Sequence, residues 1–517
     1  MKRIFPILLI ASFFSLTACS DWLEVLPNNE QVTGKYWKSK EDVEAVLASG
    51  YLYMRESVPT LIRWGELRGG TLYSNNNDDT PLQDFNMVPT EPICDYSVFY
   101  KIINMANSVL KYAPAVKDID DTYHEAVMRS HLVEAYFLRA FSYFQLVRNY
   151  QEVPLVLEAY VTDEASYVLA KSDEATIVDQ IKDDLLNALA SGAAKETFEE
   201  TWQTKGRATK WALYALMADV CLWDEDYDRC IAYSDSILTA TAAFRPVFMQ
   251  DPLRWFEMFY PGNSNESILE LNWDNQTYGQ RNNFGSYFAL DAAARLKFTE
   301  TAMQDFKEET ALVMATDPTL DGRWGRTLMA TYVHTSATPA DYDKSAYYFV
   351  WKYKGTDVAD RDNMRNAEDA NFILYRVAEI MLMKAEALVM KGEGYWDEAL
   401  AIINQLRTRA SLPALVVTTS EVDELDMLMH VLHERQMEFV AEGKRWYDLL
   451  RFGRLQEYKY KEQFINLVVT SNQTTNPQWI RSVLKNEHAW FMPIPYSETQ
   501  VNPLLKQNPY YANESTN

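Results

Sequence analysis

Apolar residues recur at steps of three and four along most of the chain. Within 132–150 they occupy Val133, Phe137, Ala140, Phe144 and Val147, the spacing that places side chains on one face of an α-helix. The same spacing predicts helices over 177–190, 208–223, 230–238, 372–390, 399–410 and 423–452. Long alternating segments are missing, and two short ones, 268–273 and 347–353, predict small β-hairpins. The predicted fold class is therefore mainly α.

Two helical segments share one spacing of small and aromatic residues. Each has two small residues twelve positions apart, with an aromatic residue three positions before the second: Ala218, Tyr227 and Cys230 in one copy, and Ala387, Trp396 and Ala399 in the other. Small residues let two antiparallel helices approach, and the ring fills the turn. The spacing resembles the tetratricopeptide unit, although generic helical packing stays open. Two further hairpins are expected, from 131–150 with 177–190 and from 43–55 with 96–112.

The composition changes along the chain and suggests its organisation. Helical repeats are expected mainly in 40–240 and 370–455. Between about 251 and 369 the chain fills with Asn, Gly, Pro, Tyr and Trp, so loops with short β-hairpins should dominate there. Prolines at 493, 495, 503 and 509 cannot continue a helix, which predicts an extended tail from about 490 to 517. We expect a single domain over 19–517.

Charge narrows the class of partner. The chain has 517 residues, 48% of them hydrophobic and 24% charged, which is typical of a folded soluble body. Acids outnumber bases 73 to 49, and the formal net charge is −24. A surface this negative repels phosphate backbones, so we expect no nucleic-acid partner.

The first residues predict export. Lys2 and Arg3 precede a short apolar run, and small residues lead to Cys19, which is typical of a secretory signal over 1–18. The sequence Leu16-Thr17-Ala18-Cys19 resembles the lipobox of bacterial lipoproteins. That resemblance implies lipidation of Cys19 and anchoring through two or more acyl chains. The alternative is an ordinary signal peptide with a chance cysteine. Cys94, Cys221 and Cys230 form no CxxC motif, and either a bridge between the last two or buried thiols fits their positions.

Enzymatic signatures are scarce. The six histidines form no HExxH, and neither GxSxG nor GxxxxGK[ST] occurs. His430 and His433 beside Glu434 offer a metal site, but positions flanking an ordinary helix explain them as well. With 73 acids, carboxylate pairs arise by chance, so a glycosidase is neither supported nor excluded by counting them. We expect a protein without catalytic activity.

Blocks of sequence at 19–25, 36–43, 134–155, 434–449 and 493–509 follow one another along the chain. Both these blocks and their order are similar to those of the SusD/RagB family of surface lipoproteins. In the fourth block, Arg435, Glu438, Glu442 and Arg445 step by three or four, so they should pair as ions along one helix. Trp446 and Leu449 share a face that should be buried against the repeats.

The resemblance implies a lid that binds glycan nutrients and delivers them to a SusC-like TonB-dependent transporter of the outer membrane. The protein would be lipid-anchored, would face the cell exterior, and would break no bond itself. Two alternatives remain: a periplasm-facing tetratricopeptide-type scaffold for protein partners, and a lid that binds peptides rather than glycans.

A sugar offers hydroxyls to polar groups and a C–H face to aromatic rings, so a binding surface needs exposed rings beside Asn, Asp and Arg. Two regions and one further ring supply this mixture. The candidates are Trp64, Arg68, Tyr73, Asn76 and Asp79 in the first region, Trp273, Asn275, Tyr278 and Tyr287 in the second, and Trp324. The run 75–79 offers oxygen ligands for a structural calcium ion but lacks the spacing of a dedicated loop, and we expect no cofactor.

Overall fold

The computed structural model describes residues 36–160, 167–252, 254–288, 294–317, 331–333, 348–356, 364–365, 368–474 and 476–512. Cys19 and Trp324 lie outside these residues. Helices dominate the described chain, which confirms the predicted fold class. None of the described helices is both long enough and apolar enough to cross a membrane.

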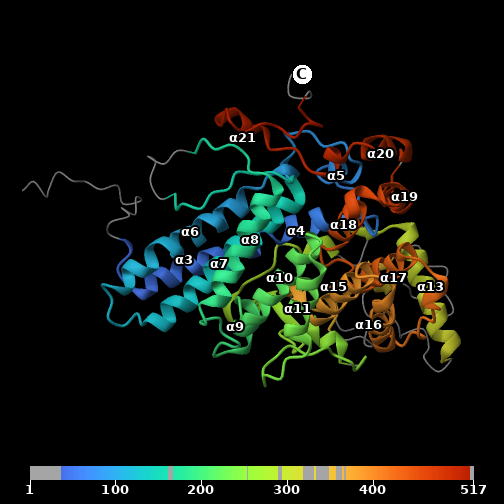
Figure 1. Ribbon diagram of the computed structural model, residues 1–517, viewed down its shortest axis with the longest axis horizontal. Coiled ribbons are helices and arrows are strands. Elements are labelled where there is room, and N and C mark those ends of the chain that lie inside the picture. The colour runs from blue at the N-terminus through green and yellow to red at the C-terminus, as the bar shows by residue number, and fades with distance from the viewer. Residues whose placement is uncertain are drawn as a thin grey trace, which may run out of the picture.

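The main helices pack in sequence order as an array of hairpins (Figure 1). They are α3 (Lys40–Glu56), α6 (Ser97–Lys117), α7 (Glu125–Tyr150), α8 (Glu174–Ala190), α10 (Lys210–Trp223), α11 (Tyr227–Leu238), α15 (Val377–Met390) and α16 (Trp396–Arg409). Each predicted hairpin is present, because α3 packs on α6, α7 on α8, α10 on α11 and α15 on α16. Helix α11 also contacts α15, so the two copies of the repeated spacing lie next to each other although 138 residues separate these helices in the sequence.

Polar residues mark where these helices begin. The side chain of Asp173 accepts a hydrogen bond from the backbone of Thr176 at the start of α8, and Asp226 accepts one from Arg229 at the start of α11. Such caps satisfy N–H groups that have no partner within the helix. In the second copy, the Trp396 indole donates to the carbonyl of Val389 over 3.0 Å and closes the turn.

The repeated spacing has the packing role that the sequence predicts. Ala218, Cys230, Ala387 and Ala399 are all fully buried. Cys94, Cys221 and Cys230 are free, buried thiols. Burial raises the pKa of Cys94 and of Cys221 to about 12, because the thiolate loses its hydration. The chemistry of these sulfurs is that of small apolar side chains, and no bridge joins Cys221 to Cys230.

The strands are short, and most pair with distant segments. They are β1 (Leu72–Ser74), β2 (Ser267–Leu271), β3 (Leu296–Phe298), β4 (Thr331–Val333), β5 (Tyr348–Val350) and β6 (Phe372–Arg376). The pairs β1–β3, β2–β6 and β4–β5 are all antiparallel. The predicted hairpin at 268–273 is therefore wrong, because β2 takes its partner from a segment about a hundred residues later. The predicted helix at 372–390 begins too early, because residues 372–376 form β6.

The predicted helix over 423–452 is interrupted. Helix α17 (Glu424–Glu438) ends before a turn, and α18 (Arg445–Tyr458) begins after it. Within the turn, Ala441 and Gly443 have φ of +66° and +72°, a conformation that a helix does not contain. Helix α4 (Val58–Glu66) packs against this turn. An added Cβ on its Gly65 would lie 2.0 Å from the Gly443 carbonyl oxygen, so only glycine allows this approach.

The break changes the predicted ion pairs along 435–445. Instead of pairing along one helix, the two glutamates join charged residues from other elements in a fully buried cluster, here called the Arg376 network. Its members are Glu266, Lys352, Arg376, Arg409, Glu438 and Glu442. Arg376 donates to Glu438 over 2.6 Å and to Glu442 over 2.9 Å, while Lys352 donates to Glu442 over 2.6 Å. Although burial opposes ionisation, Arg376 and Lys352 lower the pKa of the Glu442 carboxyl.

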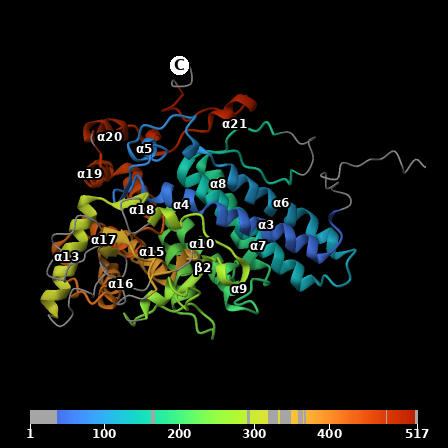
Figure 2. The same ribbon diagram turned by 180° about the vertical axis from the view of Figure 1, so that it is seen from behind.

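Shorter helices and loops complete the molecule (Figure 2). They include α5 (Thr80–Gln83), α9 (Thr201–Gly206), α12 (Asn275–Tyr278), α13 (Glu300–Thr316), α19 (Lys461–Ser471), α20 (Pro477–Leu484) and α21 (Tyr496–Val501). Helix α13 lies in the segment expected to be mostly loop, although Ala302, Phe306 and Val313 are buried at helical spacing. From Phe491 to Ala512 the tail is non-helical except for α21, and the backbone N–H of Met492 donates to the carbonyl of Asn149 over 2.7 Å.

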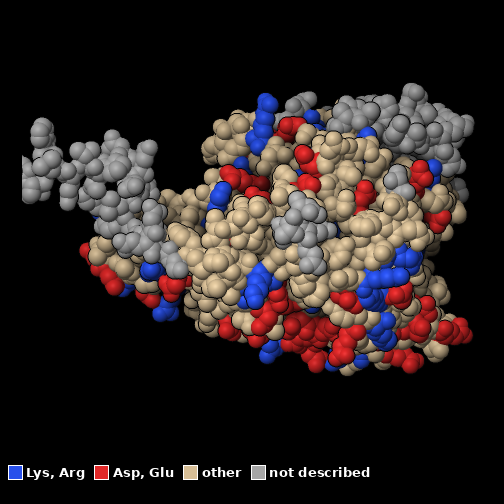
Figure 3. Space-filling model, turned by 90° about the horizontal axis from the view of Figure 1, so that it is seen from above, with Lys and Arg blue, Asp and Glu red and all other residues tan. Residues whose placement is uncertain are grey.

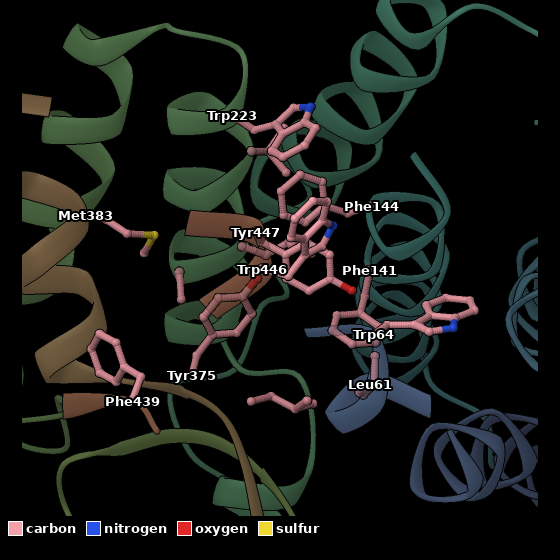
Figure 4. Close-up of a cluster of buried hydrophobic side chains, with 14 of the residues drawn as sticks. Leu61, Trp64, Phe141, Phe144, Trp223, Tyr375, Met383, Phe439, Trp446 and Tyr447 are labelled. Carbon is pink, nitrogen blue, oxygen red and sulfur yellow. The ribbon is translucent and has the colours of Figure 1, made fainter. Parts of the chain in front are cut away.

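A continuous apolar core joins the array to the C-terminal helices (Figure 4). Trp446 and Leu449 are fully buried, as predicted. The Trp446 ring packs against Phe85 and Phe464, so its neighbours come from both ends of the chain. Acidic side chains gather along one edge of the surface in Figure 3.

Candidate ligand-binding surface

Two predicted site residues belong to the core. Trp64, on α4, is fully buried; its indole donates to the carbonyl of Ile93 over 2.9 Å, and its ring stacks on Phe99 (Figure 4). Arg68 is also fully buried and donates to the carbonyl of Trp490 and to the Asn149 side chain, each over 3.0 Å. The prediction that these two side chains face a ligand is therefore wrong in this conformation. The segment mixes rings with charges, but α4 is covered by α18, and its sequence does not show that.

The structure brings Asp79 and Tyr287 together on Arg295, and Tyr73 and Asn76 lie in the strand and turn that lead to Asp79. Asp79 is buried and accepts two hydrogen bonds from the Arg295 guanidinium, at 2.6 and 2.7 Å. The same guanidinium lies 4.9 Å from the centre of the Tyr287 ring. Strand β1 carries Tyr73 opposite Lys297 of β3, which brings residues 73–79 beside the second region. We call this the Asp79 cluster.

Asp79 supports the cluster rather than offering a free carboxylate. It also accepts from the Ser74 hydroxyl over 2.8 Å, and the Arg63 guanidinium lies 3.5 Å away. These contacts use its oxygens, so the run 75–79 lacks the central carboxylate that a calcium site would need. Asn76 is exposed, and its side-chain oxygen accepts from the backbone of Asp78 over 2.9 Å. The turn therefore presents the exposed side chains of Asn76 and Asp78 to solvent, whereas the Asp79 carboxylate is buried beneath it.

The other members of the second region lie beside the end of α3. Asp274 caps α12 by accepting from the backbone of Thr277 over 2.8 Å, and Gly279 ends the helix with φ of +65°. Tyr278 is 71% exposed on this short helix, whereas Asn275 is half-buried. Trp273 is only 8% exposed; its ring packs against Phe284, and the Arg55 guanidinium lies 5.0 Å from its centre. Tyr278 is therefore the free ring of this region.

A pocket of about 510 Å³ lies between α3 and α9, and we call it the α3–α9 pocket. Its lining includes Leu52, Arg55, Trp202, Arg207 and Asn272. Trp202 is 53% exposed, and its backbone carbonyl accepts from the Asn272 side chain over 3.2 Å. Asn272 is followed by Trp273 and, three residues later, by the start of α12, the helix that carries Tyr278.

Sequence reasoning missed Trp202 and Arg295. Trp202 stands in the polar run Glu199-Glu200-Thr201-Trp202-Gln203-Thr204-Lys205, where a lone tryptophan was a usable signal. Arg295 carried no such signal, since its role comes from Asp79, which is 216 residues away. A further pocket of about 370 Å³ lies between α6 and the tail and is lined by several tyrosines, among them Tyr100 and Tyr167.

Titratable groups near this surface give little support for catalysis. Donating hydrogen bonds to the Asp79 carboxylate raises the pKa of Arg295, and burial lowers the pKa of Arg55. Arginine nonetheless stays protonated at neutral pH. Among the described residues, no group of three or more His, Cys, Asp or Glu side chains is placed to hold a metal ion. The arrangement of rings, amides and fixed cations is suited to binding.

Comparisons with known proteins agree with this description. A family model described as SusD family matches residues 325–511, and a second, described as starch-binding associating with outer membrane, matches residues 21–222. SusD-like protein P38 of Formosa agariphila is 27% identical over 521 residues, covering 93% of this chain and 96% of that protein. Starch-binding protein SusD of Bacteroides thetaiotaomicron is 37% identical over 92 residues, which are 18% of this chain and 15% of that protein.

Solved structures share the fold. A SusD superfamily protein of Bacteroides vulgatus superposes with a TM-score of 0.75 at 22% identity, covering 92% of this chain and 100% of the other. Surface glycan-binding protein A of Bacteroides uniformis has a TM-score of 0.70 at 20% identity, with 91% and 100% covered. A laminarin-binding SusD-like protein has a TM-score of 0.67 at 20% identity, with 91% and 99% covered.

The fold and the surface define a helical-repeat binding protein. The chain is SusD-like: two SusD family models match separate parts of it, and full-length SusD-like relatives and SusD superfamily structures align with more than nine-tenths of it. SusD-like proteins are binding proteins rather than enzymes, and the description of one matching model associates the family with starch binding and the outer membrane. This confirms the resemblance seen in the sequence.

Proposed function

We propose that this protein is a lipid-anchored, surface-exposed glycan-binding protein of the outer membrane. It captures oligosaccharides and delivers them to a SusC-like TonB-dependent transporter. The family supports glycan binding, since related proteins are named for starch, laminarin and surface glycans. Delivery to a transporter and the outward orientation are the finer parts of the proposal.

The observation that carries glycan binding is a pair of exposed rings beside fixed polar groups. Trp202 is 53% exposed in the lining of the α3–α9 pocket, and Tyr278 is 71% exposed on α12, which begins three residues after Asn272 of that lining. A ring this open to water loses apolar burial and is more useful as a flat platform for the C–H face of a sugar. The nearby Asn272, Gln203 and Arg207 supply hydrogen-bonding groups for hydroxyls.

The Asp79 cluster would form a second part of the same ligand surface. Arg295 holds Asp79 from one side and Arg63 from the other, so the turn carrying Asn76 is rigid without a ligand. A preorganised turn binds with a smaller entropy cost than a mobile one. Tyr73 remains a candidate ring on this side, whereas Trp324, outside the described residues, remains a candidate from the sequence alone.

Isothermal titration of the purified protein against neutral and acidic oligosaccharides and against peptides tests the binding step. Saturable heat with at least one glycan series, reduced in Tyr278→Ala or Trp202→Ala, supports the proposal. Binding to peptides alone would favour the peptide-binding alternative. No heat with any glycan or peptide would contradict a nutrient-binding role.

Location and partner require separate measurements in cells. Cys19→Ala should release the protein from the membrane fraction, because the acyl chains that hold it attach at this thiol. Protease added to intact cells should digest the wild-type protein, whereas a periplasm-facing scaffold would survive. Affinity purification from solubilised outer membranes should recover a TonB-dependent transporter in stoichiometric amount, and its absence would contradict delivery.

A further inference from the structure

The α3–α9 pocket contains a cation without a counter-charge. Arg55 lines the pocket near the C-terminal end of α3 and is half-buried. Within the described part of the chain its side chain makes no ion pair and no hydrogen bond, and its Nε atom is buried without a partner. Its contact is with the Trp273 ring, 5.0 Å from the guanidinium carbon. Burial without a carboxylate costs free energy, which lowers the pKa of Arg55.

The other basic side chain of the pocket is neutralised. Arg207 donates to both carboxylate oxygens of Glu134, at 2.6 and 2.9 Å. The Tyr51 hydroxyl donates to the same carboxylate over 2.7 Å, which leaves Arg207 firmly held. Glu44, an acidic member of the lining, is drawn toward Lys40 and His131, at 3.9 and 3.7 Å. Among the described residues, Arg55 is therefore the basic side chain of this lining that has no counter-charge.

Exposed apolar groups stand beside this cation. Trp202 is 53% exposed and Leu52 is 48% exposed, and both line the pocket with Arg55. The Asn272 side chain fixes the backbone of Trp202, so α9 is tied to the end of β2. A flat ring next to a free guanidinium matches a ligand that has both an apolar face and a planar or tetrahedral anionic group.

We propose that the α3–α9 pocket binds an acidic sugar residue, with its anionic group on Arg55 and its ring face on Trp202. This proposal rests on the glycan-binding function proposed above and specifies its substrate class. The anionic group is a uronate carboxylate or a sulfate ester, because a guanidinium donates two parallel hydrogen bonds to either. A neutral sugar would leave the Arg55 charge unpaired in the filled pocket and would bind less tightly.

Titration of the purified protein with three oligosaccharide series of equal length tests the proposal. The probes are oligogalacturonates for the carboxylate, sulfated galactose oligosaccharides for the sulfate, and maltooligosaccharides as the neutral series. We expect one acidic series to bind at least about tenfold more tightly than the neutral one, the difference expected for hydrogen bonds to a charged group. Its affinity should fall as salt is raised, because the contact is ionic.

Substitutions test whether the preference for an acidic ligand comes from Arg55 and Trp202. Arg55→Met keeps the stem on Trp273 but removes the charge, and should weaken the acidic ligand by about tenfold or more, whereas Arg55→Lys should retain part of the affinity. Trp202→Ala should weaken it as well. Arg229→Met, which removes an exposed arginine on α11, is the matched control and should change nothing. Circular dichroism shows whether each variant is folded.

The outcomes separate this proposal from the wider function. If neutral glycans bind and acidic ones bind no better, the acidic-sugar proposal fails while glycan binding stands. Undiminished acidic affinity in folded Arg55→Met would overturn the assigned site. If no series binds the wild type, both proposals fail.

Discussion

Arginines in two regions of the molecule meet opposite surroundings. In the Arg376 network, three buried carboxylates face three buried cations, and Arg376 contacts every one of the carboxylates. In the α3–α9 pocket, Arg55 has an aromatic ring but no carboxylate among the described residues. Removing a charge from water is costly in both places. The network offsets that cost internally, whereas the pocket leaves it for a ligand to offset.

Arg68 separates these two cases further. It also lacks a carboxylate among the described residues, and its guanidinium lies 4.3 Å from the centre of the Trp446 ring. Yet it is fully buried, donates to two neutral oxygens, and burial lowers its pKa to about 10. An unpaired arginine therefore indicates a binding site only where a cavity reaches it. Arg55 meets that condition and Arg68 does not.

The largest expected effect comes from breaking the network. Arg376→Met leaves Glu266, Glu438 and Glu442 with too few cations in a buried setting, and should lower the free energy of unfolding by about 3–5 kcal/mol. Urea unfolding followed by circular dichroism measures it. Arg229→Met, at an exposed position, should stay within about 0.5 kcal/mol. A loss below about 1 kcal/mol for Arg376→Met would show that the three buried carboxylates do not depend on Arg376 for their charge compensation.

The next effect concerns the turn that supports the network. Gly65→Ala places a Cβ 2.0 Å from the backbone oxygen of Gly443, so the turn must move. We expect a loss of about 1–3 kcal/mol, the cost typical of overpacking, measured by urea unfolding. Gly394→Ala is the control, because an added Cβ there meets no atom within 4 Å. Equal stability of the two variants would contradict the close approach of α4 to the turn.

A pH-dependent effect tests a carboxyl that stands outside the network. Glu66 is fully buried and makes no ion pair among the described residues, and burial raises its pKa from 4.5 to about 8 despite a 2.7 Å hydrogen bond from the Gly443 N–H. The folded state therefore keeps a proton that the unfolded state loses near pH 4.5. The contribution to stability is full below that pH and is lost as the pH rises to about 8.

Glu66→Gln removes this titration while retaining an oxygen for the Gly443 N–H. Between pH 5 and 8 the variant should gain stability relative to wild type by up to about 1.4 kcal/mol per pH unit. Urea unfolding at several pH values in this range measures the difference. A constant difference across the range would show that Glu66 titrates normally.

The smallest effect on stability is expected in the pocket. Trp202→Ala removes a ring that is already 53% exposed, so the free energy of unfolding should change by no more than about 0.5 kcal/mol. Glycan affinity, measured by titration, should nevertheless fall by roughly tenfold. Trp64→Ala provides the contrast, because loss of a fully buried tryptophan should cost about 3–5 kcal/mol. Similar stability losses in both variants would contradict the assignment of Trp64 to the core and of Trp202 to the binding surface.

The helical scaffold could be predicted because its signal is local. The spacing of Ala218 and Cys230 predicted two close helices, and α10 and α11 pack as expected. Errors came where a distant segment decides the local conformation. Residues 372–376 have an apolar pattern that suits a helix or a buried strand, and pairing with β2 makes them a strand.

The candidate site was predictable in composition but not in geometry. Asp79 and Tyr287 were expected in separate regions, and Arg295 contacts both, while the pairing of β1 with β3 brings Tyr73 alongside. Trp64 with Arg68, which were predicted from the sequence, and Trp202 with Arg55, which were not, each combine a ring with a guanidinium. Burial separates them, and burial depends on which elements cover each side chain.

The amino-acid sequence alone determined the helical class and the repeated hairpins, because both depend on contacts between residues a few positions apart. It also showed the family resemblance, through blocks of similar sequence. Only the tertiary structure decided which charges are paired and which rings stay open to solvent. A carboxylate such as Glu134 or Glu442 neutralises an arginine that lies far away in the sequence. The same residue types therefore make a core in one place and a binding surface in another.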